Sequence, residues 1–390
     1  MATTKFRDAS PYTKKWVAPM EDYLYAEYEA DVSQDMSKCV TTKPIGMAIF
    51  GLGRAGSIHL ANVARNPRTT LHYIVDDMTN KWDKIKTYWN LKNVTFLTSK
   101  DAEKVFTDPR VDAVIVASPT FTHEGIVTKA LNNKKAVFCE KPIAENAEAS
   151  ARCYQLANRM GKPLFSAFNR RFDPSYSAVR DRVRRGEVGH VQVIKVCARD
   201  SPIPTVDYLS HSGGIFHDCI VHDIDMVTWV VGELPVMVQA TAVAHIPEIK
   251  AINDFDSVAS ILTFPSGTIA MLENSRCSNY GYDQRLEVFG QRGMIRADNE
   301  RPMHCNEVQL GQTGCTVAPI WYSFPSRFKR AYMLEMEHFL NVCEGKVQPM
   351  VKGHQTLAVS KIATAMEQSA RTGQTVMIPW TAEEMAREYS

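Results

Sequence analysis

The pattern of hydrophobic and polar residues along the chain changes near residue 45 and again near residue 170. Between residues 45 and 168, short runs of Val, Ile, Ala and Phe alternate with stretches in which hydrophobic residues recur at helical spacing. Continuous hydrophobic runs are typical of strands buried on both faces, and their alternation with helices is typical of a parallel sheet. We therefore expect an α/β domain with helices on both faces of its sheet. Its six expected strands cover residues 45–50, 70–75, 94–98, 112–118, 135–140 and 163–168.

Beyond residue 170 the strand patterns follow one another directly. Two helical stretches, 174–185 and 215–231, flank a strand pattern at 191–198. Strands without helices between them indicate an antiparallel sheet, so we expect an α+β domain with a large, mostly antiparallel sheet. Two late helical stretches, 326–344 and 354–371, are long enough to pack back onto the first domain. The later strand patterns cover residues 236–245, 257–264, 267–275, 285–290 and 293–298, with PSG at 265–267 predicting a hairpin turn.

A glycine pattern directly follows the first expected strand. FGLGRAG places Gly51, Gly53 and Gly56 in G-x-G-x-x-G spacing. The first glycine allows a tight turn, the second lets the backbone approach a pyrophosphate, and the third lets the helix pack closely on the strand. The helix that begins at Arg54 and Ala55 offers free N–H groups and a positive dipole end to the phosphates. This context predicts a Rossmann dinucleotide-binding domain.

The second expected strand ends in a pair of acids. Asp76 lies 20 residues beyond Gly56, where a carboxylate can accept hydrogen bonds from the adenosine ribose. Because a carboxylate there repels a 2′-phosphate, the pattern favours NAD over NADP. Asp77 can share or take this role, and Lys81 lies nearby. The alternative interpretation is an ordinary acid in a solvated loop.

The fifth expected strand ends in Glu140, Lys141 and Pro142. Ligands of parallel sheets bind at the carboxyl ends of the strands. Proline favours an extended backbone at the preceding Lys141, which places its ammonium group in the crevice beside the cofactor. Two interpretations remain open at this point, a functional cation and an ordinary lysine at the end of a strand.

The segment HDCIVHDIDM, residues 217–226, crowds titratable groups onto a helix that otherwise looks buried. Asp218 and His222 are four residues apart and share a helix face, and Asp225 lies three further on. A carboxylate that holds one imidazole nitrogen raises the basicity of the other. We predict that neutral His222 removes the hydroxyl proton of a secondary alcohol while Lys141 hydrogen-bonds the same oxygen.

Two other interpretations of this segment compete with acid–base chemistry. A metal site is disfavoured because His217 and His222 are five residues apart and do not share a face. The chain also has no HExxH or paired CxxC motif, so we expect no metal. The second alternative is a buried histidine that an aspartate satisfies for structural reasons alone.

Several motifs together carry a resemblance to a known family. The glycine loop, SPTFTH at 118–123, CEKP at 139–142 and the segment from Asp218 to His222 occur in an order that resembles the Gfo/Idh/MocA oxidoreductases. Within that family the chain most resembles the inositol 2-dehydrogenase group, through FNRRFDPSY, GGIFHDCIVHDID and NSRCSNYGYDQR. The resemblance spans roughly residues 44 to 380.

The resemblance implies a function and a site. It implies NAD-dependent oxidation of a hydroxyl on a cyclic polyol or sugar, with conversion of myo-inositol to 2-keto-myo-inositol as the best candidate. It places Lys141 and His222 at the reacting oxygen, with Asp218 beside them as the third catalytic residue. The further residues that it implies are Ser118, Pro119, His123 and Glu140 for the cofactor, and Asn169, Arg171, Tyr280 and Tyr282 for the substrate. The alternatives are a reductase of carbonyl or imine substrates and a silent dinucleotide-binding regulator.

The composition of the chain indicates which classes of partner and which cellular compartment to expect. The 45 basic and 43 acidic residues give a net charge of +2, which offers no reason to expect nucleic acid or an anionic membrane. No hydrophobic run approaches the roughly 20 residues of a membrane span. Nine cysteines without a CxxC favour reduced thiols in the cytoplasm. The family resemblance implies a homodimer or homotetramer, assembled through the open face of the second sheet.

These patterns divide the chain into four predicted regions. They are an N-terminal extension (1–43), the Rossmann domain (44–168), a substrate and oligomerisation domain (169–325) and C-terminal helices that pack toward the Rossmann domain (326–390). The extension lacks the hydrophobic core of a signal peptide, and its seven acidic residues argue against a mitochondrial presequence. It is either a surface appendage or an arm that packs on a neighbouring subunit.

Overall fold

Six parallel strands form the first sheet of the computed structural model, which describes residues 43–303, 307–310 and 314–387. The predicted N-terminal extension therefore lies outside the described residues, except for its last position. The strand order is β3-β2-β1-β4-β5-β6. Strands β2 and β3 lie on one side of β1 and strands β4 to β6 on the other, and this switch in the order of connection is typical of dinucleotide-binding folds. The parallel sheet is confirmed. Its strands are β1 (Ile45–Phe50), β2 (Thr69–Val75), β3 (Thr95–Leu97), β4 (Ala113–Val116), β5 (Ala136–Cys139) and β6 (Leu164–Ser166).

Helices cover both faces of this sheet, which explains why its strands are hydrophobic throughout. In β1, Met47 and Ile49 pack into one hydrophobic cluster, whereas Ala48 and Phe50 pack into another on the opposite face. Each strand therefore needs hydrophobic side chains in both directions. The covering helices include α2 (Arg54–Ala64), α3 (Trp82–Trp89), α4 (Glu103–Thr107), α5 (His123–Asn132) and α6 (Ala147–Met160).

The second sheet has seven strands in the order β12-β11-β7-β10-β9-β8-β15. Every neighbouring pair is antiparallel except β7 and β10, which confirms the mostly antiparallel sheet. Thr263 pairs with Ile269 across the hairpin whose turn contains PSG. The strands are β7 (Val191–Arg199), β8 (Met237–Val243), β9 (Ser257–Thr263), β10 (Ile269–Ser275), β11 (Asp283–Gly290), β12 (Gly293–Ala297) and β15 (Val376–Met377).

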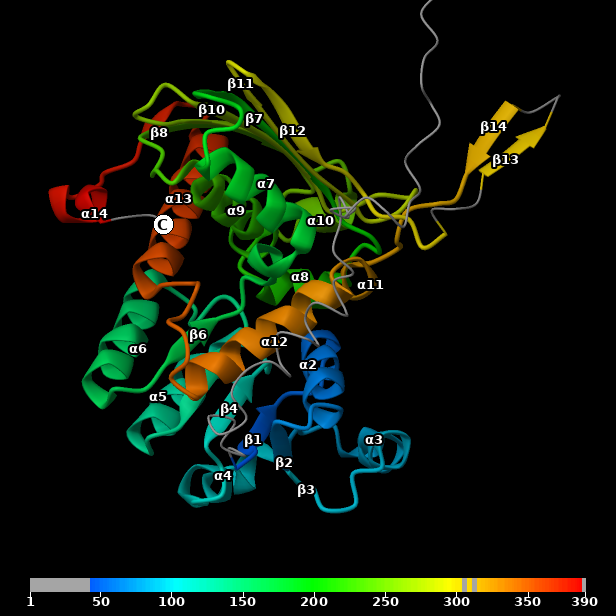
Figure 1. Cartoon of the computed structure of the whole chain (residues 1–390), viewed down its shortest axis with the longest axis vertical. Coiled ribbons are helices and arrows are strands. Elements are labelled where there is room, and N and C mark those ends of the chain that lie inside the picture. Colours follow the sequence, from blue (N-terminus) through cyan, green and yellow to red (C-terminus); the bar gives the residue numbers. More distant parts are fainter. Residues whose placement is uncertain (1–42, 304–306, 311–313, 388–390) are drawn as a thin grey trace, which may run out of the picture. The chain divides into compact units, whose positions relative to one another are not determined.

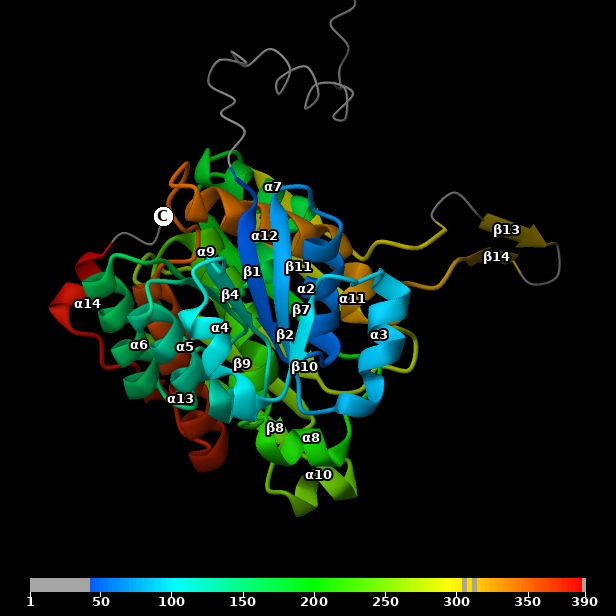
Figure 2. The same cartoon turned by 90° about the horizontal axis from the view of Figure 1, so that it is seen from below.

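Helices pack on one face of the second sheet and leave the other face open (Figure 1). The packed helices are α7 (Pro174–Arg184), α9 (Val221–Val231) and α13 (Gly353–Thr372). Four short helices and one hairpin were not predicted, because a few residues carry too little periodicity. They are α8 (Val206–His211), α10 (Pro247–Ala251), α11 (Phe324–Arg327), α14 (Ala382–Ala386) and the hairpin of β13 (Glu307–Leu310) and β14 (Gly314–Val317), which projects from the body in Figures 1 and 2.

The C-terminal helices join the two sheets. Helix α12 (Lys329–Cys343) packs on α2, where Asn62 Nδ2 donates to the Tyr332 carbonyl oxygen at 3.1 Å. Helix α13 contacts α6 and β6 as well as β8 and α9. One hydrophobic cluster accordingly contains residues of both sheets, such as Ile49 and Ile194. The domain boundaries at 168 and 325 remain predictions.

A membrane-spanning helix needs about 20 predominantly hydrophobic residues. Among the helices of the described residues, none combines the necessary length with the necessary hydrophobicity.

Candidate active site

The loop between β1 and α2 has the geometry of a dinucleotide-binding turn. Gly51 has φ +91°, and a Cβ there would lie 2.6 Å from the Ala117 carbonyl oxygen. A Cβ on Gly56 would lie 2.0 Å from the Gly51 carbonyl oxygen, so strand and helix pack too closely for a side chain. A Cβ on Gly53 would meet nothing within 4 Å, and Gly53 caps α2 without any side-chain bond. The loop thus presents open space and free N–H groups that fit a pyrophosphate.

Asp76 lies beside this loop and is tied to it. Its Oδ2 accepts from the Leu52 N–H at 2.7 Å, and its Oδ1 accepts from the Met78 N–H at 2.8 Å. A carboxylate has further lone pairs, so acceptor sites remain for a ribose. Asp77 instead accepts from the Ser99 N–H at 2.8 Å. Of the two acids, Asp76 is the one bonded to the glycine loop, and its contact with the adenosine ribose remains a prediction.

The remaining residues predicted for the cofactor have different surroundings. Arg54 donates to Ser323 Oγ at 2.9 Å, and its guanidinium lies 4.4 Å from the centre of the Phe324 ring. It therefore joins the N-terminal end of α2 to α11. Ala55 lies in the first turn of α2, with a partly exposed side chain. Pro119 follows β4 and precedes a short 3₁₀ turn, Thr120–Thr122.

His123 links the loops after β4 and β5. It is 1% exposed, and its two ring nitrogens each lie 2.8 Å from a main-chain oxygen, of Ser118 and of Pro142. Through these two contacts the imidazole holds the loop after β4 and the loop after β5 together. The direct cofactor contact predicted for His123 is therefore corrected to a supporting role.

Glu140 and Lys141 leave the end of β5 in different directions. Glu140 Oε1 lies 2.8 Å from Nε2 of His59 on α2, inside the first domain. Lys141, whose peptide bond to Pro142 is cis, reaches toward the second domain. Its Nζ donates to the main-chain oxygen of Asp218 at 2.5 Å and to Asp218 Oδ1 at 3.2 Å. The structure thus brings together Lys141 and Asp218, which are 77 positions apart in the sequence.

Asp218 lies in a π-helical turn, Phe216–Ile220, that precedes α9. Its Oδ1 also accepts from the Tyr208 hydroxyl at 2.9 Å, and its Oδ2 accepts from Arg276 at 3.2 Å. Within the described part of the chain, Nδ1 of His222 is buried without a hydrogen-bond partner. The predicted bond between Asp218 and His222 is wrong, because the wider π turn does not have the i, i+4 geometry of an α-helix.

His222 has the electrostatic surroundings of a neutral base. Burial, and then the charges of Lys141 and Arg170, hold the pKa of His222 well below its usual value. The Phe168 ring packs edge-on against the imidazole at 5.9 Å between centroids. The side chain is nevertheless partly exposed. The imidazole is therefore neutral, and it lies close enough to Lys141 for the ammonium charge to lower its pKa.

The other aspartates of α9 serve the structure. Asp223 pairs with Arg170 and accepts from Asn274 Nδ2 at 2.6 Å. Asp225 accepts from Arg171 Nε at 2.9 Å and from its NH2 at 2.6 Å. Because Arg171 is 0% exposed, the substrate contact predicted for it is corrected to a structural ion pair. The aspartates make α9 rich in charge although it is buried.

Replacing Arg171 by methionine is expected to lower the free energy of unfolding by about 3–5 kcal/mol, because Asp225 would remain as a buried, unpaired charge. Arg180→Met is the matched control. Both guanidinium groups lie over the Trp229 ring, at 5.6 and 5.2 Å, but the Arg180 side chain is 25% exposed. Denaturant titration of both variants checks this, and equal losses would contradict a special cost at Arg171.

Sequence reasoning missed two titratable residues of this region, Arg170 near His222 and Asp200 near Asp218. Arg170 acts on the pKa of His222 through its positive charge, and the first of the two adjacent arginines is therefore the one beside the site. Asp200 follows β7, where Cys219 Sγ approaches its Oδ2 at 3.2 Å, and burial raises the pKa of Asp200. Its place at the end of a strand was the signal that could have found it. Asn169, predicted for the substrate, is buried at the start of the 3₁₀ turn Asn169–Phe172.

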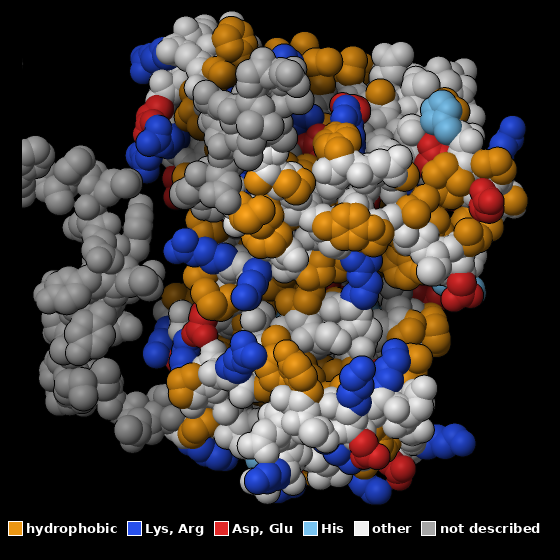
Figure 3. Space-filling view, turned by 90° about the vertical axis from the view of Figure 1, so that its right-hand side faces the viewer, with side chains coloured by type: hydrophobic (Ala, Val, Ile, Leu, Met, Phe, Trp, Pro, Cys, Tyr) orange, Lys and Arg blue, Asp and Glu red, His pale blue; other side chains and the backbone are white. Residues whose placement is uncertain are grey.

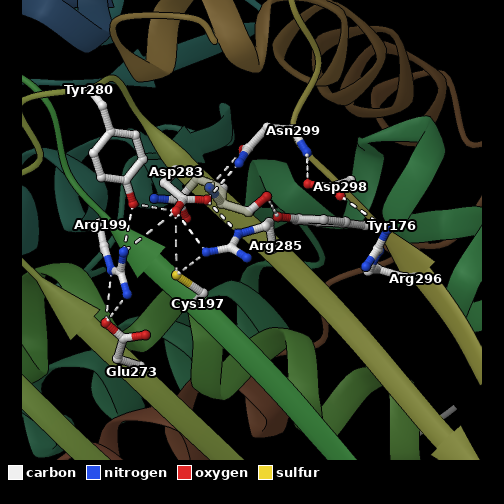
Figure 4. A network of polar contacts seen from close by, with 11 residues as sticks. Tyr176, Cys197, Arg199, Glu273, Tyr280, Asp283, Arg285, Arg296, Asp298 and Asn299 are labelled. Atoms are coloured by element: carbon white, nitrogen blue, oxygen red, sulfur yellow. Dashed lines mark hydrogen bonds and ion pairs between the residues drawn. The ribbon is translucent and has the colours of Figure 1, made fainter. Parts of the chain in front are cut away.

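The two predicted tyrosines lie in different surroundings. Tyr280 is 54% exposed, and its hydroxyl donates to Asp283 at 2.5 Å and accepts from Arg199 at 2.7 Å, within the network of Figure 4. Tyr282 is buried against the rings of Phe324 and Phe328. Among the described residues, neither hydroxyl bonds to the groups around Lys141. Their substrate contacts remain predictions.

Two further features of the molecule are the possible metal ligands among the described residues and the distribution of charge on the surface in Figure 3. Among the described residues, no three His, Cys, Asp or Glu side chains are grouped to hold a metal ion. On the side of the molecule in Figure 3, Lys and Arg side chains are scattered among hydrophobic ones and do not form one patch. Lys141, Asp218 and His222 remain the predicted catalytic residues.

Comparisons with known proteins give a consistent result. A family model for oxidoreductases with an NAD-binding Rossmann fold matches residues 45–168, and one for the GFO/IDH/MocA C-terminal domain matches 176–296. Inositol 2-dehydrogenase of Rhizobium meliloti is 36% identical over 83% of this chain and 96% of its own length. Myo-inositol 2-dehydrogenase of Thermotoga maritima is 34% identical over 79% of this chain and 90% of its own.

Solved structures agree with these relatives. A myo-inositol dehydrogenase of Corynebacterium glutamicum superposes with a TM-score of 0.79 at 31% identity, over 87% of this chain and 100% of that one. A scyllo-inositol dehydrogenase of Lactobacillus casei, solved with NAD(H) and scyllo-inositol, has a TM-score of 0.79 at 26% identity. It covers 86% of this chain and 99% of its own.

Proposed function

Because the chain belongs to the GFO/IDH/MocA family of NAD-binding oxidoreductases, we propose that it oxidises a secondary hydroxyl of a cyclic polyol. The best candidate reaction converts myo-inositol to 2-keto-myo-inositol with NAD⁺ as hydride acceptor. The observation that carries the proposal is the Lys141 ammonium group, held by Asp218, beside neutral His222. The relatives named as inositol dehydrogenases support the choice of substrate class.

The proposed mechanism assigns one task to each side chain. Bound NAD⁺ supplies the acceptor for the hydride that leaves the carbinol carbon. His222 takes the hydroxyl proton, so the C–H and O–H bonds break as the C=O bond forms. Lys141 donates an N–H to the same oxygen and stabilises the negative charge that develops there. Asp218 holds the ammonium group in place.

A substrate panel tests this function. Purified protein is assayed at several pH values with NAD⁺ or NADP⁺ and with myo-inositol, scyllo-inositol, aldoses and open-chain polyols. We expect NADH formation with NAD⁺ and an inositol. Absence of turnover with every one of these alcohols would refute the proposal, and turnover of aldoses alone would change the substrate.

Asp76→Asn is expected to reduce the preference for NAD⁺ over NADP⁺, measured as the ratio of kcat/KM values, by at least about tenfold. The substitution removes the charge that repels a 2′-phosphate and keeps one acceptor oxygen for the backbone. Asp77→Asn is the matched control, since Asp77 bonds to Ser99 and not to the glycine loop. An unchanged ratio in Asp76→Asn would contradict the assignment.

We infer that the protein assembles through the open face of the second sheet. Its strands alternate buried and exposed residues, and the exposed side chains include Ile261 (43%) and Met271 (45%), which pair directly across β9 and β10. A hollow of about 580 Å³ lies on the sheet, lined by both of them and by Lys195 and Glu287. Contiguous exposed hydrophobic area of this kind favours a second copy as the partner.

Ile261→Lys is expected to shift the protein from dimer or tetramer toward monomer, because the interface would have to bury an unpaired charge. Light scattering after size-exclusion chromatography measures the mass. Met333→Lys on α12, with a comparable exposure of 47%, is the control. A wild-type protein that is already monomeric would contradict the interface.

We also propose the cytoplasm as the compartment. Six cysteines of the described residues are free thiols, and Cys139, Cys153 and Cys219 among them are buried. Reduced thiols in such number are typical of a reducing compartment.

A further inference from the structure

We propose that Arg276 is a positioning residue of this reaction, which holds Asp218 in the orientation in which Asp218 holds Lys141. The proposal rests on the proposed function and deepens it. Arg276 follows β10 directly and is 0% exposed. It therefore acts on the substrate only through Asp218, and it was not among the residues that the sequence predicted.

The guanidinium of Arg276 bridges two aspartates. Its NH1 donates to Asp218 Oδ2 at 3.2 Å, and its NH2 donates to Asp254 Oδ2 at 3.1 Å. The other oxygen of Asp254 accepts from the Ile215 N–H at 3.0 Å. Arg276 thus fixes the side chain within the π turn, and Asp254 fixes the backbone just before it.

The backbone around this bridge is fitted closely to it. Gly214 has φ +84°, and a Cβ there would lie 3.2 Å from Asp254 Oδ1. The Arg276 N–H donates to the Asp256 carbonyl oxygen at 2.9 Å. The π turn is therefore attached at two points, to Asp254 in the loop between α10 and β9 and to Arg276 directly after β10. A turn held in this way keeps the Asp218 carbonyl and carboxylate aimed at Lys141.

The charges around Asp218 are balanced through Arg276. The groups that face Asp218 are Lys141 from β5, Arg276 from β10, Tyr208 from α8, and Asp200 and Cys219 beside it. Burial raises the pKa of Asp218, while Lys141, Arg276 and Tyr208 together lower it below its usual value. Without Arg276 that pKa rises, so Asp218 takes up a proton at a higher pH and releases Lys141. In the Arg276 variant, protonation of Asp218 should then limit activity at a higher pH than protonation of His222 does in the wild type.

Arg276→Met, Arg276→Lys and the wild type are compared in the inositol assay over pH 5 to 9. We expect Arg276→Met to lower kcat about 10- to 100-fold, to leave KM for NAD⁺ within about twofold, and to shift the acidic limb upward. Arg276→Lys, which keeps the charge, should recover part of kcat and most of the pH profile. If Arg276→Met does not fold, Asp254→Asn loosens the same bridge and should give a smaller loss of kcat of about fivefold.

Arg327→Met is the matched control, because Arg327 is equally buried and pairs with Asp173 at 2.7 Å away from Lys141. It should lower the melting temperature without moving the pH profile. The proposal is overturned if folded Arg276 variants keep kcat within twofold of the wild type, or if they behave like Arg327→Met. A wild type that oxidises no polyol refutes the proposed function itself, which separates the two failures.

Discussion

Lys141→Met is expected to lower kcat for inositol oxidation by about 10²- to 10³-fold while the Kd for NAD⁺ changes less than about threefold. In the proposed mechanism the ammonium group donates to the reacting oxygen, and removal of one such donor costs this much in other enzymes. The contacts of Lys141 run to Asp218, away from the glycine loop that fits the pyrophosphate. Steady-state kinetics and fluorescence titration with NADH measure the two quantities separately.

Lys135→Met provides the control for this experiment. Lys135 precedes β5 at its amino end, is buried, and donates to the Asp108 carbonyl oxygen at 2.8 Å, whereas Lys141 is partly exposed. The same chemical change is thus made at the opposite end of the same strand. If both variants lose kcat equally, the lower kcat reflects a loss of folded protein, and the proposed catalytic role of Lys141 is contradicted.

His222→Asn is expected to lower kcat by about 10²- to 10⁴-fold and to remove the acidic limb from the pH dependence of kcat/KM. Burial and the charges of Lys141 and Arg170 lower the pKa of His222, so in the wild type the imidazole remains unprotonated as the pH falls below 6.5. The wild-type activity should therefore persist below pH 6.5 and decline only at more acidic values. Initial rates between pH 5 and 9 measure both effects.

His217→Asn is the control for His222, because it alters a histidine in the π turn that directly precedes α9, the helix that carries His222. His217 Nε2 lies 3.3 Å from Oε2 of Glu367 on α13 and not beside Lys141. The kcat of His217→Asn should remain within about threefold of the wild-type kcat. An acidic limb that survives in His222→Asn would show that another group carries the proton.

The sequence predicted the first sheet well because hydrophobic runs on two-sided strands are a local signal. The place of Lys141 at the end of β5 followed from the same reasoning. The bond between Asp218 and His222 could not be judged in this way, because nothing local in the sequence distinguishes a π turn from an α-helical one. The sequence pointed to Arg171 and not to its neighbour Arg170 for a similar reason. Neighbouring residues in a 3₁₀ turn point about 120° apart, and tertiary packing alone decides which of the two buried arginines lies near His222.

The contacts that complete the site were beyond sequence reasoning. Tyr208 and Arg276 both bond to Asp218, but they come from α8 and from the end of β10. Helix α8 has six residues, too few for a periodic signal. The order of the second sheet, with β7 between β11 and β10, likewise depends on long-range pairing. Partners that are distant in the chain leave no spacing rule to find them.

Helices α12 and α13 limit where this chain can be truncated. Residues from both sheets share one hydrophobic cluster, and α12 covers α2 while α13 contacts α6 and β6. A fragment that stops near residue 168 would retain every strand of the nucleotide-binding sheet and still lose the cover over one of its faces. Expressed by itself, such a fragment would expose that uncovered surface to water and tend to aggregate.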